Sequence, residues 1–532
     1  MKLNRGPALL ALCLAAFIIN LDTTIVNVAL PSLVRETKAN TTDLQWIVDA
    51  YNLVFAALIL VAGSLSDRFG RKGMLLGGLL VFAASSAAGA MCTSPHQLIA
   101  ARAFMGLGAA MIFPSTLSLI SNVFVDRSDR AKAIGLWGAT AGMGVAMGPI
   151  FGGWLLEHFW WGSIFVFIVP IAAIVALLVG LFVPTSRDES TPPIDKRGFV
   201  LSITAMTALI LAVIQGPDWG WSSDRTLACF SIGLVLLAGF LTTESRTKNP
   251  MLDVRLFKNP RFTASSGSVT IAFFALSGFI FLITQYFQFV KAYSPFATGV
   301  RLLPVAGSVG ASSVIGTRLA VRVGNKAIVA TGLALFSGGL LWVSTGSQAT
   351  SYLVIAAQMV VLGTGMGLTT APATEAIMGV VPIEKAGVGS AVNDATRLFG
   401  ATLGVAVIGS VASSLYTSKL ASILPEGLPP RAVSAANGSV GGATIAAAKI
   451  QQAGFLHIAQ RLEAAATTAF LHSLSGGCIV AGTVAAVGAL VAAAFLPSRP
   501  GPVAKVVDRP ARKEREEFEL VGSNVGQSPD TW

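Results

Sequence analysis

Six charged residues lie inside stretches of sequence that are otherwise long and apolar. They are Asp22, Asp49, Arg102, Glu375, Asp394 and Arg397. A charge in a lipid bilayer is costly unless it meets a partner or water, so such residues usually serve a function. Carboxyl groups in this setting can take up and release protons or bind cations, and a buried arginine can act as their counter-ion. The sequence therefore predicts ion chemistry inside a membrane.

Two of the acids belong to the first two apolar stretches. At the rise of an α-helix, Asp22 lies about 12 Å and Asp49 about 8 Å from the outer ends of their helices. We therefore expect both carboxyls to share one outward vestibule. Asp22 is the first candidate for a proton carrier, because loss of water around a carboxyl favours its protonated form. The alternative is a static ion pair between Asp22 and Arg102. Asp49 is expected to recognise a cation or to bind a second proton.

Glu375 and Asp394 approach one predicted loop from opposite sides. Both should lie about 10 Å deep, where a cationic substrate entering from the cytoplasm or the inner leaflet would meet them. Arg397 follows Asp394 by three residues and shares its helix face. Asp394 and Arg397 either bind substrate or only neutralise each other, which would leave Glu375 as the freer acid.

Five aromatic residues fall on helix faces predicted to line the same cavity. They are Phe17, Tyr51, Phe113, Tyr286 and Phe289. An aromatic ring attracts a cation to its face, so these side chains are candidates for stacking on a planar cationic substrate. Ordinary packing between helices is the alternative for each of them.

These residues need helices to position them. Fourteen apolar segments are long enough to cross a bilayer, which takes about 20 residues. The segments are 8–30, 44–65, 74–92, 98–121, 134–156, 163–183, 199–215, 226–242, 263–289, 298–317, 327–344, 352–379, 388–414 and 474–496. They predict an all-α polytopic membrane protein in which two six-helix bundles flank two additional helices. Many secondary transporters consist of two such halves with the substrate path between them.

The chain divides accordingly. Residues 1–183 are expected to form the N-terminal six-helix bundle, 184–262 a linker with two additional transmembrane helices, and 263–496 the C-terminal six-helix bundle. The last part includes a long extracellular segment at about 415–473, rich in Ala, Gly and Ser. This segment is either an ordered outer hairpin that gates the exit or a flexible loop. Residues 497–532 are expected to be a polar cytoplasmic tail.

The charge distribution predicts the orientation. Most of the 37 Lys and Arg residues fall in loops on one side of the predicted spans. Since such residues are enriched on the cytoplasmic side, both termini are expected in the cytoplasm and the protein in the cell membrane. The first apolar stretch follows Lys2 and Arg5 but has no small-residue cleavage site. It is therefore predicted to be a retained helix and not a signal peptide.

The composition excludes several other classes of protein. Only 12% of the 532 residues are charged and 53% are hydrophobic, so the charges are too few to cover several soluble domains. The four cysteines and four histidines are scattered, and no metal site is predicted. Dispersed basic residues argue against binding of nucleic acid. The sequence lacks a G-x-x-x-x-G-K-[ST] phosphate loop and a nucleophile–base cluster, so neither ATP, nor another cofactor, nor enzyme activity is expected.

A ten-residue motif, GSLSDRFGRK, joins the second and third predicted spans. Its residues of interest are Gly63, Asp67, Arg68, Gly70, Arg71 and Lys72. Gly63 permits close approach of helices, and Asp67 can pair with an arginine or a helix N-terminus. Arg71 and Lys72 alone would also suit a simple basic anchor on the cytoplasmic side.

The fifth predicted span carries small residues at regular intervals. They include Gly144, Gly148, Pro149, Gly152 and Gly153. Glycines four residues apart form a smooth helix face for packing, and a proline removes a backbone hydrogen bond and permits a bend. The pattern predicts a tight helix contact in the first half of the protein.

These motifs resemble those of the major facilitator superfamily. The segment 63–72 resembles its loop motif, which implies a conformational switch. Arg102 and the glycines after it resemble its buried-arginine motif, and the fifth span resembles the motif of its antiporters. The segment 21–31, LDTTIVNVALP, resembles the 14-helix drug:proton antiporters, which are multidrug exporters. The likeness covers nearly the whole chain except 415–473 and the tail.

The resemblance implies a major facilitator fold and proton-coupled efflux of cationic or amphipathic drugs by alternating access. It implies protons, such small molecules and membrane lipid as partners, the proton gradient as energy source, and a monomer as the favoured state. The tenth span has no acidic residue where some dication exporters carry one, which argues against efficient export of dications. An exporter of an endogenous metabolite, lipid or self-made antibiotic would use the same mechanism. A non-transporting membrane sensor is the remote alternative.

Overall fold

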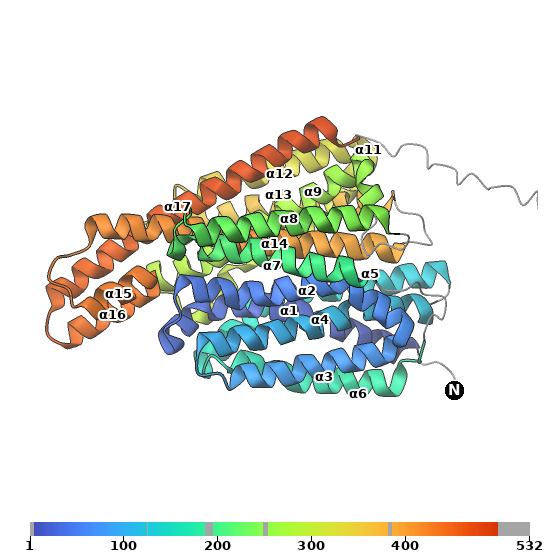
Figure 1. Ribbon diagram of the computed structural model, residues 1–532, viewed down its shortest axis with the longest axis horizontal. Helices are drawn as coiled ribbons and strands as arrows, with labels where there is room; N and C mark the ends of the chain where they lie inside the picture. Colours follow the sequence, from blue (N-terminus) through green and yellow to red (C-terminus); the bar gives the residue numbers. More distant parts are fainter. Residues whose placement is uncertain (1–4, 125, 187–194, 248–253, 381–385, 498–532) are drawn as a thin grey trace, which may run out of the picture. The chain divides into compact units, whose positions relative to one another are not determined.

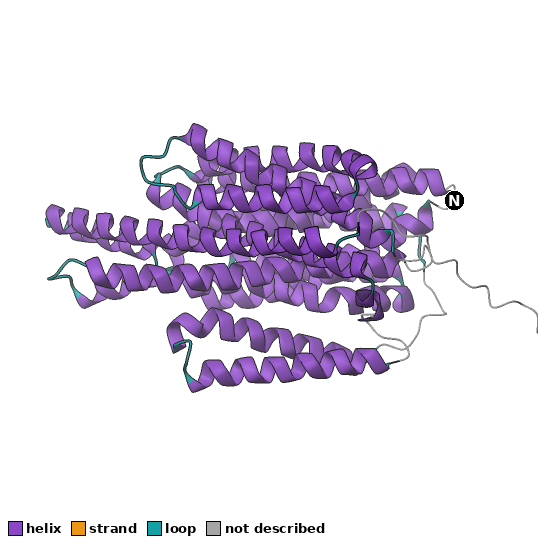
Figure 2. Cartoon of the chain, turned by 90° about the horizontal axis from the view of Figure 1, so that it is seen from above, coloured by secondary structure: helices purple, strands orange, loops and turns teal. Residues whose placement is uncertain are grey.

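The protein is helical almost throughout. The computed structural model describes residues 5–124, 126–186, 195–247, 254–380 and 386–497. Among these residues there are helices and loops but no strand (Figure 2). The predicted tail from residue 498 onward lies outside the described part of the chain.

The first eight helices fall at the positions of the first eight predicted spans (Figure 1). They are α1 (Arg5–Thr37), α2 (Thr41–Phe69), α3 (Arg71–Ala90), α4 (Pro95–Val123), α5 (Arg127–His158), α6 (Ser163–Phe182), α7 (Lys196–Trp219) and α8 (Asp224–Arg246). The predicted extra pair corresponds to α7 and α8.

The remaining elements form the second half of the chain. They are η1 (Val254–Lys258), α9 (Pro260–Gln285), η2 (Tyr286–Val290), α10 (Pro295–Arg301), α11 (Leu303–Val323), α12 (Asn325–Val343), α13 (Tyr352–Met378), α14 (Ala386–Ile423), α15 (Pro430–Gly438), α16 (Val440–Gln452) and α17 (Leu456–Phe495). Across the described residues, 13 stretches of helix are long and apolar enough to cross a membrane. With α2, which occupies the second predicted span, they account for the fourteen predicted spans.

Two predicted spans differ in detail from the structure. The tenth is broken between α10 and α11, because Pro304 has no N–H to donate to a carbonyl four residues earlier. The ninth ends in the π-helical turn η2, where the Lys291 N–H donates to the Tyr286 carbonyl at 3.0 Å. Irregular turns of this kind redirect side chains at the end of a helix.

The helices turn at two opposite ends. We call the end with the loops at 38–40, 220–223 and 344–351 the hairpin end, and the other, with Gly70 and Gly324, the motif end. At the hairpin end, Asn40 and Asp43 form a capping box that starts α2. At the motif end, Gly70 joins α2 to α3 with φ at 112°, a conformation that favours glycine.

Each half of the protein packs mainly on itself. In the first half, α1 lies against α5 and α2 against α4, and in the second half α13 lies against α11 and α12, and α9 against α14. The halves meet where α2 contacts α14, α5 contacts α10, and α1 contacts α9. The extra helix α8 packs chiefly on α7, which in turn contacts α2 and α14.

The segment at 415–473 is made of helices. α14 and α17 run far beyond the predicted spans, and α15 and α16 connect them (Figure 1). The Tyr416 hydroxyl donates to the Ala436 carbonyl at 2.9 Å, and the Thr41 hydroxyl of α2 donates to the Gly438 carbonyl at 3.0 Å. The segment is therefore folded and docked at the hairpin end, and a gating role stays a prediction.

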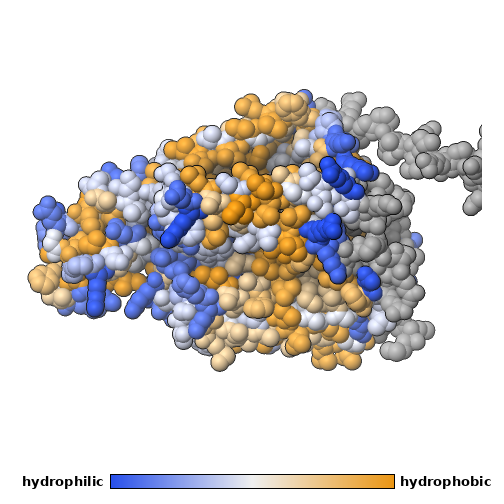
Figure 3. Space-filling view, in the orientation of Figure 1, coloured by the Kyte–Doolittle hydropathy of each residue, from blue (hydrophilic) through white to orange (hydrophobic). Residues whose placement is uncertain are grey.

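Apolar side chains cover much of the face shown in Figure 3, and the bluest residues lie toward its two ends. Leu234 and Val235 of α8 and Leu490 of α17 are among the large apolar residues that are exposed. A soluble protein rarely exposes so many. A lipid bilayer accounts for these exposed apolar side chains. Helices in a bilayer form all their backbone hydrogen bonds internally, and their outer side chains face the lipid acyl chains.

Candidate functional site

The central feature of the first half is an ion pair between α1 and α4. The Arg102 Nη1 lies 2.6 Å from the Asp22 Oδ2, with 0% of the Asp22 side chain and 1% of the Arg102 side chain exposed. The Arg102 Nε donates to the Ile47 carbonyl of α2 at 3.1 Å, and its guanidinium lies 4.2 Å from the centre of the Tyr51 ring. Arg102 therefore joins α1, α2 and α4. The ion pair between Asp22 and Arg102, one of the two sequence-based possibilities, is present.

Glycines bring α5 onto the helix that carries Asp22. A Cβ atom added at Gly144 would lie 2.5 Å from the Phe17 carbonyl oxygen of α1, and one at Gly152 would lie 2.7 Å from the Ile25 side chain. Gly148, between them, faces the Thr24 side chain. A larger residue at these positions would force a shift of α1 or of its side chains, so the four-residue glycine spacing permits the close approach of α5 to α1.

The same span also contacts the second half of the protein. The Pro149 carbonyl lies against Gly299 of α10, and a Cβ atom added at Gly153 would lie 2.6 Å from the Phe296 Cα. The small residues predicted in the fifth span therefore serve two contacts, one inside the first half and one between the halves.

Two of the five candidate aromatics lie in one row of rings. The Tyr51 ring centre is 5.8 Å from that of Phe55, which is 5.9 Å from Phe113, and Phe113 is 5.1 Å from Trp137. One face of Tyr51 is taken by the Arg102 guanidinium, so that face is closed to a planar substrate. The sequence did not single out Phe55 or Trp137, because nothing in their spacing marks them.

Asp49 is buried, and the described part of the chain supplies no counter-ion for it. It is 0% exposed, and neither of its carboxylate oxygens has a hydrogen-bond partner among the described residues. The Asn52 side-chain oxygen, one turn further along α2, is in the same situation. The expected outward vestibule shared with Asp22 is not open in this conformation, since both carboxyls are fully enclosed.

The second half contains a looser polar network near the motif end. The Arg397 Nη1 lies 3.9 Å from the Asp394 Oδ1, while its Nη2 donates to the Thr374 hydroxyl at 3.1 Å. That hydroxyl donates to the Asn393 side-chain oxygen at 3.1 Å, and the guanidinium lies 5.5 Å from the Phe273 ring centre. The predicted pair forms, but at a distance where an ion pair is weak.

Glu375 lies apart from this pair. It follows Thr374 on α13 but is exposed, and its charge interacts with that of Arg261 at the start of α9. The structure thus places the three charged candidates of the second half on neighbouring helices, with Asp394 and Arg397 partly enclosed and Glu375 more accessible.

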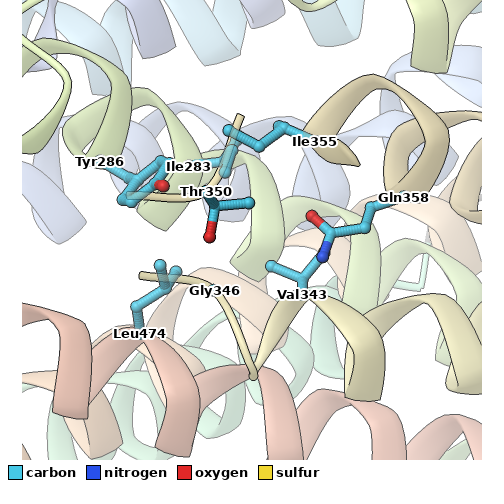
Figure 4. A pocket seen from close by; sticks show the side chains of 8 residues that line it. All are labelled: Ile283, Tyr286, Val343, Gly346, Thr350, Ile355, Gln358 and Leu474. Atoms are coloured by element: carbon cyan, nitrogen blue, oxygen red, sulfur yellow. The ribbon is translucent and has the colours of Figure 1, made fainter. Parts of the chain in front are cut away.

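Phe17 of α1 is half-buried against the core, and the remaining two candidate aromatics, Tyr286 and Phe289, lie at the hairpin end. The Tyr286 hydroxyl donates to the Ser347 carbonyl at 2.8 Å. Tyr286 also lines a small pocket between α9, α12, α13 and α17 with Gln358 and Leu474 (Figure 4). Phe289 lies 5.7 Å from the Arg35 guanidinium. The five aromatic candidates therefore do not meet in one place.

The predicted loop motif ties α2 and α3 to the end of α6. The Arg71 N–H donates to the Ser186 carbonyl at 3.0 Å, and the Lys72 ammonium donates to the Gly180 carbonyl at 2.8 Å. Arg68 lies over the neighbouring Phe69 ring. Gly63 approaches Pro114 of α4 at contact distance. The side chain of Asp67 is outside the described part of the structure.

The sequence did not predict the polar contacts between the two halves. Near the hairpin end, the Arg35 guanidinium of α1 donates to the Gln288 side-chain oxygen at 3.0 Å, and the Gln288 amide donates to the Val28 carbonyl at 2.9 Å. Gln45 of α2 makes a second set of contacts with α14. Uncharged polar residues are common in apolar spans, so no sequence signal distinguishes Gln45 and Gln288 from the other polar residues in the spans.

A buried acid–arginine pair, a glycine-rich helix contact and two interacting sets of spans are features of secondary transporters. A sequence model of the Major Facilitator Superfamily matches residues 12–405. The chain belongs to this superfamily of membrane transporters.

Several curated proteins are similar over most of the chain. Multidrug efflux pump LfrA of Mycolicibacterium smegmatis is 37% identical over 92% of this chain and 96% of its own. Multidrug resistance protein Stp of Mycobacterium tuberculosis is 36% identical over 79% of this chain and 78% of its own. Among solved structures, an inward-facing bacterial homologue of the lysosomal transporter Spinster has a TM-score of 0.66 with 17% identity and covers 94% of this chain and all of its own. That likeness concerns the fold alone.

Proposed function

We propose that this protein exports cationic or amphipathic drugs across the cell membrane in exchange for protons. The observation that carries the proposal is the enclosed Asp22–Arg102 pair, which joins α1, α2 and α4 in a member of the superfamily. Similarity to proteins named for multidrug efflux and multidrug resistance supports the drug class. The energy source is the proton gradient.

Protonation of Asp22 is the coupling step. A neutral Asp22 no longer attracts the Arg102 guanidinium as a counter-ion, so the contact at 2.6 Å weakens and α1 is released from α4. Since Gly144 and Gly152 pack α5 closely on α1, a movement of α1 carries α5 with it. α5 in turn contacts α10 of the second half. Proton binding is thereby linked to a movement between the halves.

The substrate binds near the acids that lack a strong internal partner. The Asp394 carboxylate lies 3.9 Å from the Arg397 guanidinium, a distance at which an ion pair is weak, and Glu375 is exposed on the adjacent helix. Both acids lie toward the motif end, which we assign to the cytoplasm together with the two termini. A cation entering there would reach them before it reached Asp49, whose unpartnered carboxyl serves as a second cation or proton site further in.

A second candidate is export of a compound that the cell itself makes, by the same mechanism. Two relatives that are named for resistance to, or export of, a single compound favour it. Tetracenomycin C resistance and export protein of Streptomyces glaucescens is 31% identical over 79% of this chain. Methylenomycin A resistance protein of Streptomyces coelicolor is 32% identical over 77% of it.

Transport in reconstituted vesicles tests the proposal. Purified protein in liposomes with an internal pH dye should release protons when tetraphenylphosphonium is added on the side of the motif end. Empty liposomes with the same cation are the control. Cation movement without any proton movement would contradict proton exchange, and absence of both for a panel of monocations and neutral amphiphiles would contradict the drug class.

A further inference from the structure

The seam between α2 and α14 contains a hydrogen-bonded relay that also reaches α7. Gln45 is 0% exposed, and its amide nitrogen lies 3.0 Å from the Ala406 carbonyl and 3.1 Å from the Ser410 hydroxyl. A third acceptor, the Val405 carbonyl, lies at 3.3 Å. Gly409 provides space for the Gln45 side chain, because a Cβ atom at this position would lie 2.7 Å from the Gln45 amide nitrogen.

The relay continues from α14 into the inserted helix α7. The Ser410 hydroxyl donates to the Val213 carbonyl at 2.8 Å. That carbonyl lies four residues before Pro217, which has no N–H, so it lacks the partner that a regular helix would supply. Ser410 supplies it. α7 is therefore attached to α14 through the Val213 carbonyl, which Pro217 leaves without a hydrogen-bond donor within its own helix.

Two further contacts attach α7 to the other side of the seam. The Thr42 hydroxyl of α2 lies 3.1 Å from the Asp218 carboxylate of α7. An apolar cluster of Leu53, Ile210, Ile214 and Ala406 joins α2, α7 and α14. α2 and α14 contact each other directly, and α7 lies alongside both of them (Figure 1). Any separation of α2 from α14 must therefore break contacts of α7 as well.

We infer that Gln45, Ser410 and the Val213 carbonyl form a latch that sets how readily the hairpin end opens, and that α7 is part of this gate. The inference rests on the proposed alternating access. Gln45 and Ser410 are positioning residues, since they act through helix movement and not on the substrate. The Gln45 side-chain oxygen has no partner among the described residues when the seam is closed, and water would satisfy it when the seam opens.

This imbalance explains why an amide stands at this position. The three acceptors fix the register of α2 on α14, while the unpartnered oxygen keeps the closed seam from being too stable. An apolar side chain of similar size would favour the closed seam, because it gains nothing from water. A carboxylate would favour the open seam, because it would face the Val405 and Ala406 carbonyls without a donor.

The test measures opening of the hairpin end directly. Spin labels at His96 and Ala349, exposed residues at that end in the two halves, report the distance between the halves in a cysteine-free protein in nanodiscs. We expect Gln45→Glu to raise the ratio of open to closed molecules at least tenfold, and Gln45→Leu to lower it. Pro217→Ala gives Val213 a helical partner of its own and should raise the ratio about fivefold, the effect of one net hydrogen bond.

The matched control is Gln358, another buried glutamine. Its amide donates to the Trp342 carbonyl at 3.0 Å, inside the second half. Gln358→Glu and Gln358→Leu should alter thermal stability but not the distance. If the Gln45 and Pro217 variants give the distances of wild type while wild type itself shows two states, the latch is refuted. A wild type that shows one state at every pH and substrate concentration would instead refute alternating access.

Discussion

Replacement of Asp22 by asparagine is the most direct test of the coupling site. The change keeps the shape of the side chain and removes its charge, which leaves the enclosed Arg102 guanidinium without its counter-ion. Because the pair is 0% and 1% exposed, neither water nor salt screens it strongly. Loss of one partner of such a pair typically costs about 3–5 kcal/mol. Two contacts of Arg102, the Ile47 carbonyl and the Tyr51 ring, remain, so we expect about 3 kcal/mol of lost stability.

Two assays separate the two roles of Asp22. Thermal unfolding of the purified variant should show the lost stability, and substrate-driven proton release in liposomes should be abolished. The control is Glu463→Gln, which removes an exposed acid in the folded segment of α17 and should change neither quantity. Proton release at the wild-type rate in Asp22→Asn would refute the assignment of Asp22 as proton carrier.

The double variant Asp22→Asn with Arg102→Gln distinguishes a carrier from a static pair. Without either charge, the helices no longer enclose an unpaired ion, so most of the stability should return. If Asp22 carries protons, exchange stays abolished in the stable double variant. If the pair only holds α1 against α4, exchange returns together with stability, and the proposed coupling step is wrong.

Three further predictions concern packing and substrate choice. Gly106→Ala should destabilise the protein by about 1–3 kcal/mol in thermal unfolding, since the added Cβ would lie 2.5 Å from the Tyr51 carbonyl oxygen, whereas Gly73→Ala, with open space around it, should not. Arg397→Gln should lower the Kd of tetraphenylphosphonium several-fold in equilibrium binding, because Asp394 loses an internal competitor at 3.9 Å; an unchanged or raised Kd would show that Asp394 does not bind the cation. Liposomes should accumulate monocations faster than methyl viologen, as the lack of an acid in the tenth span predicts, and equal rates would refute that interpretation.

In the proposed cycle, the proton carrier Asp22 lies in the first half, and the acids that a substrate would meet first, Asp394 and Glu375, lie in the second half. Asp22, the proposed proton site, is tightly paired and enclosed, while Asp394 is weakly paired and less enclosed and Glu375 is exposed. An acid with a strong counter-ion exchanges a proton only when the helices around it move, whereas a weakly paired acid can bind a passing cation at once.

The class of protein and its membrane spans could be predicted from the amino-acid sequence. Hydropathy is a local property, so each apolar segment of about 20 residues could be located without its neighbours. The intramembrane charges and the glycines at intervals of four were visible for the same reason. The motif resemblance to the major facilitator superfamily agrees with the family match over residues 12–405. The break in the tenth span was not predicted. Pro304 can occupy the first turn of a new helix, but it can also lie within one continuous, bent span, and the sequence does not distinguish the two.

Which of these residues meet depends on the packing of the helices, and spacing along the chain does not reveal it. Arg102 pairs with Asp22 from 80 residues away, and Gln45 bonds to a carbonyl 360 residues along the chain, at contacts fixed by which helix faces can approach. Asp49, which resembles Asp22 in type and depth, has no such partner among the described residues. The folded state of 415–473 was likewise undecided, since Ala-rich and Gly-rich sequence becomes ordered through packing and not through local preference. The spacing of residues along one helix can be read directly from the sequence. Contacts between helices depend on how all the helices pack together.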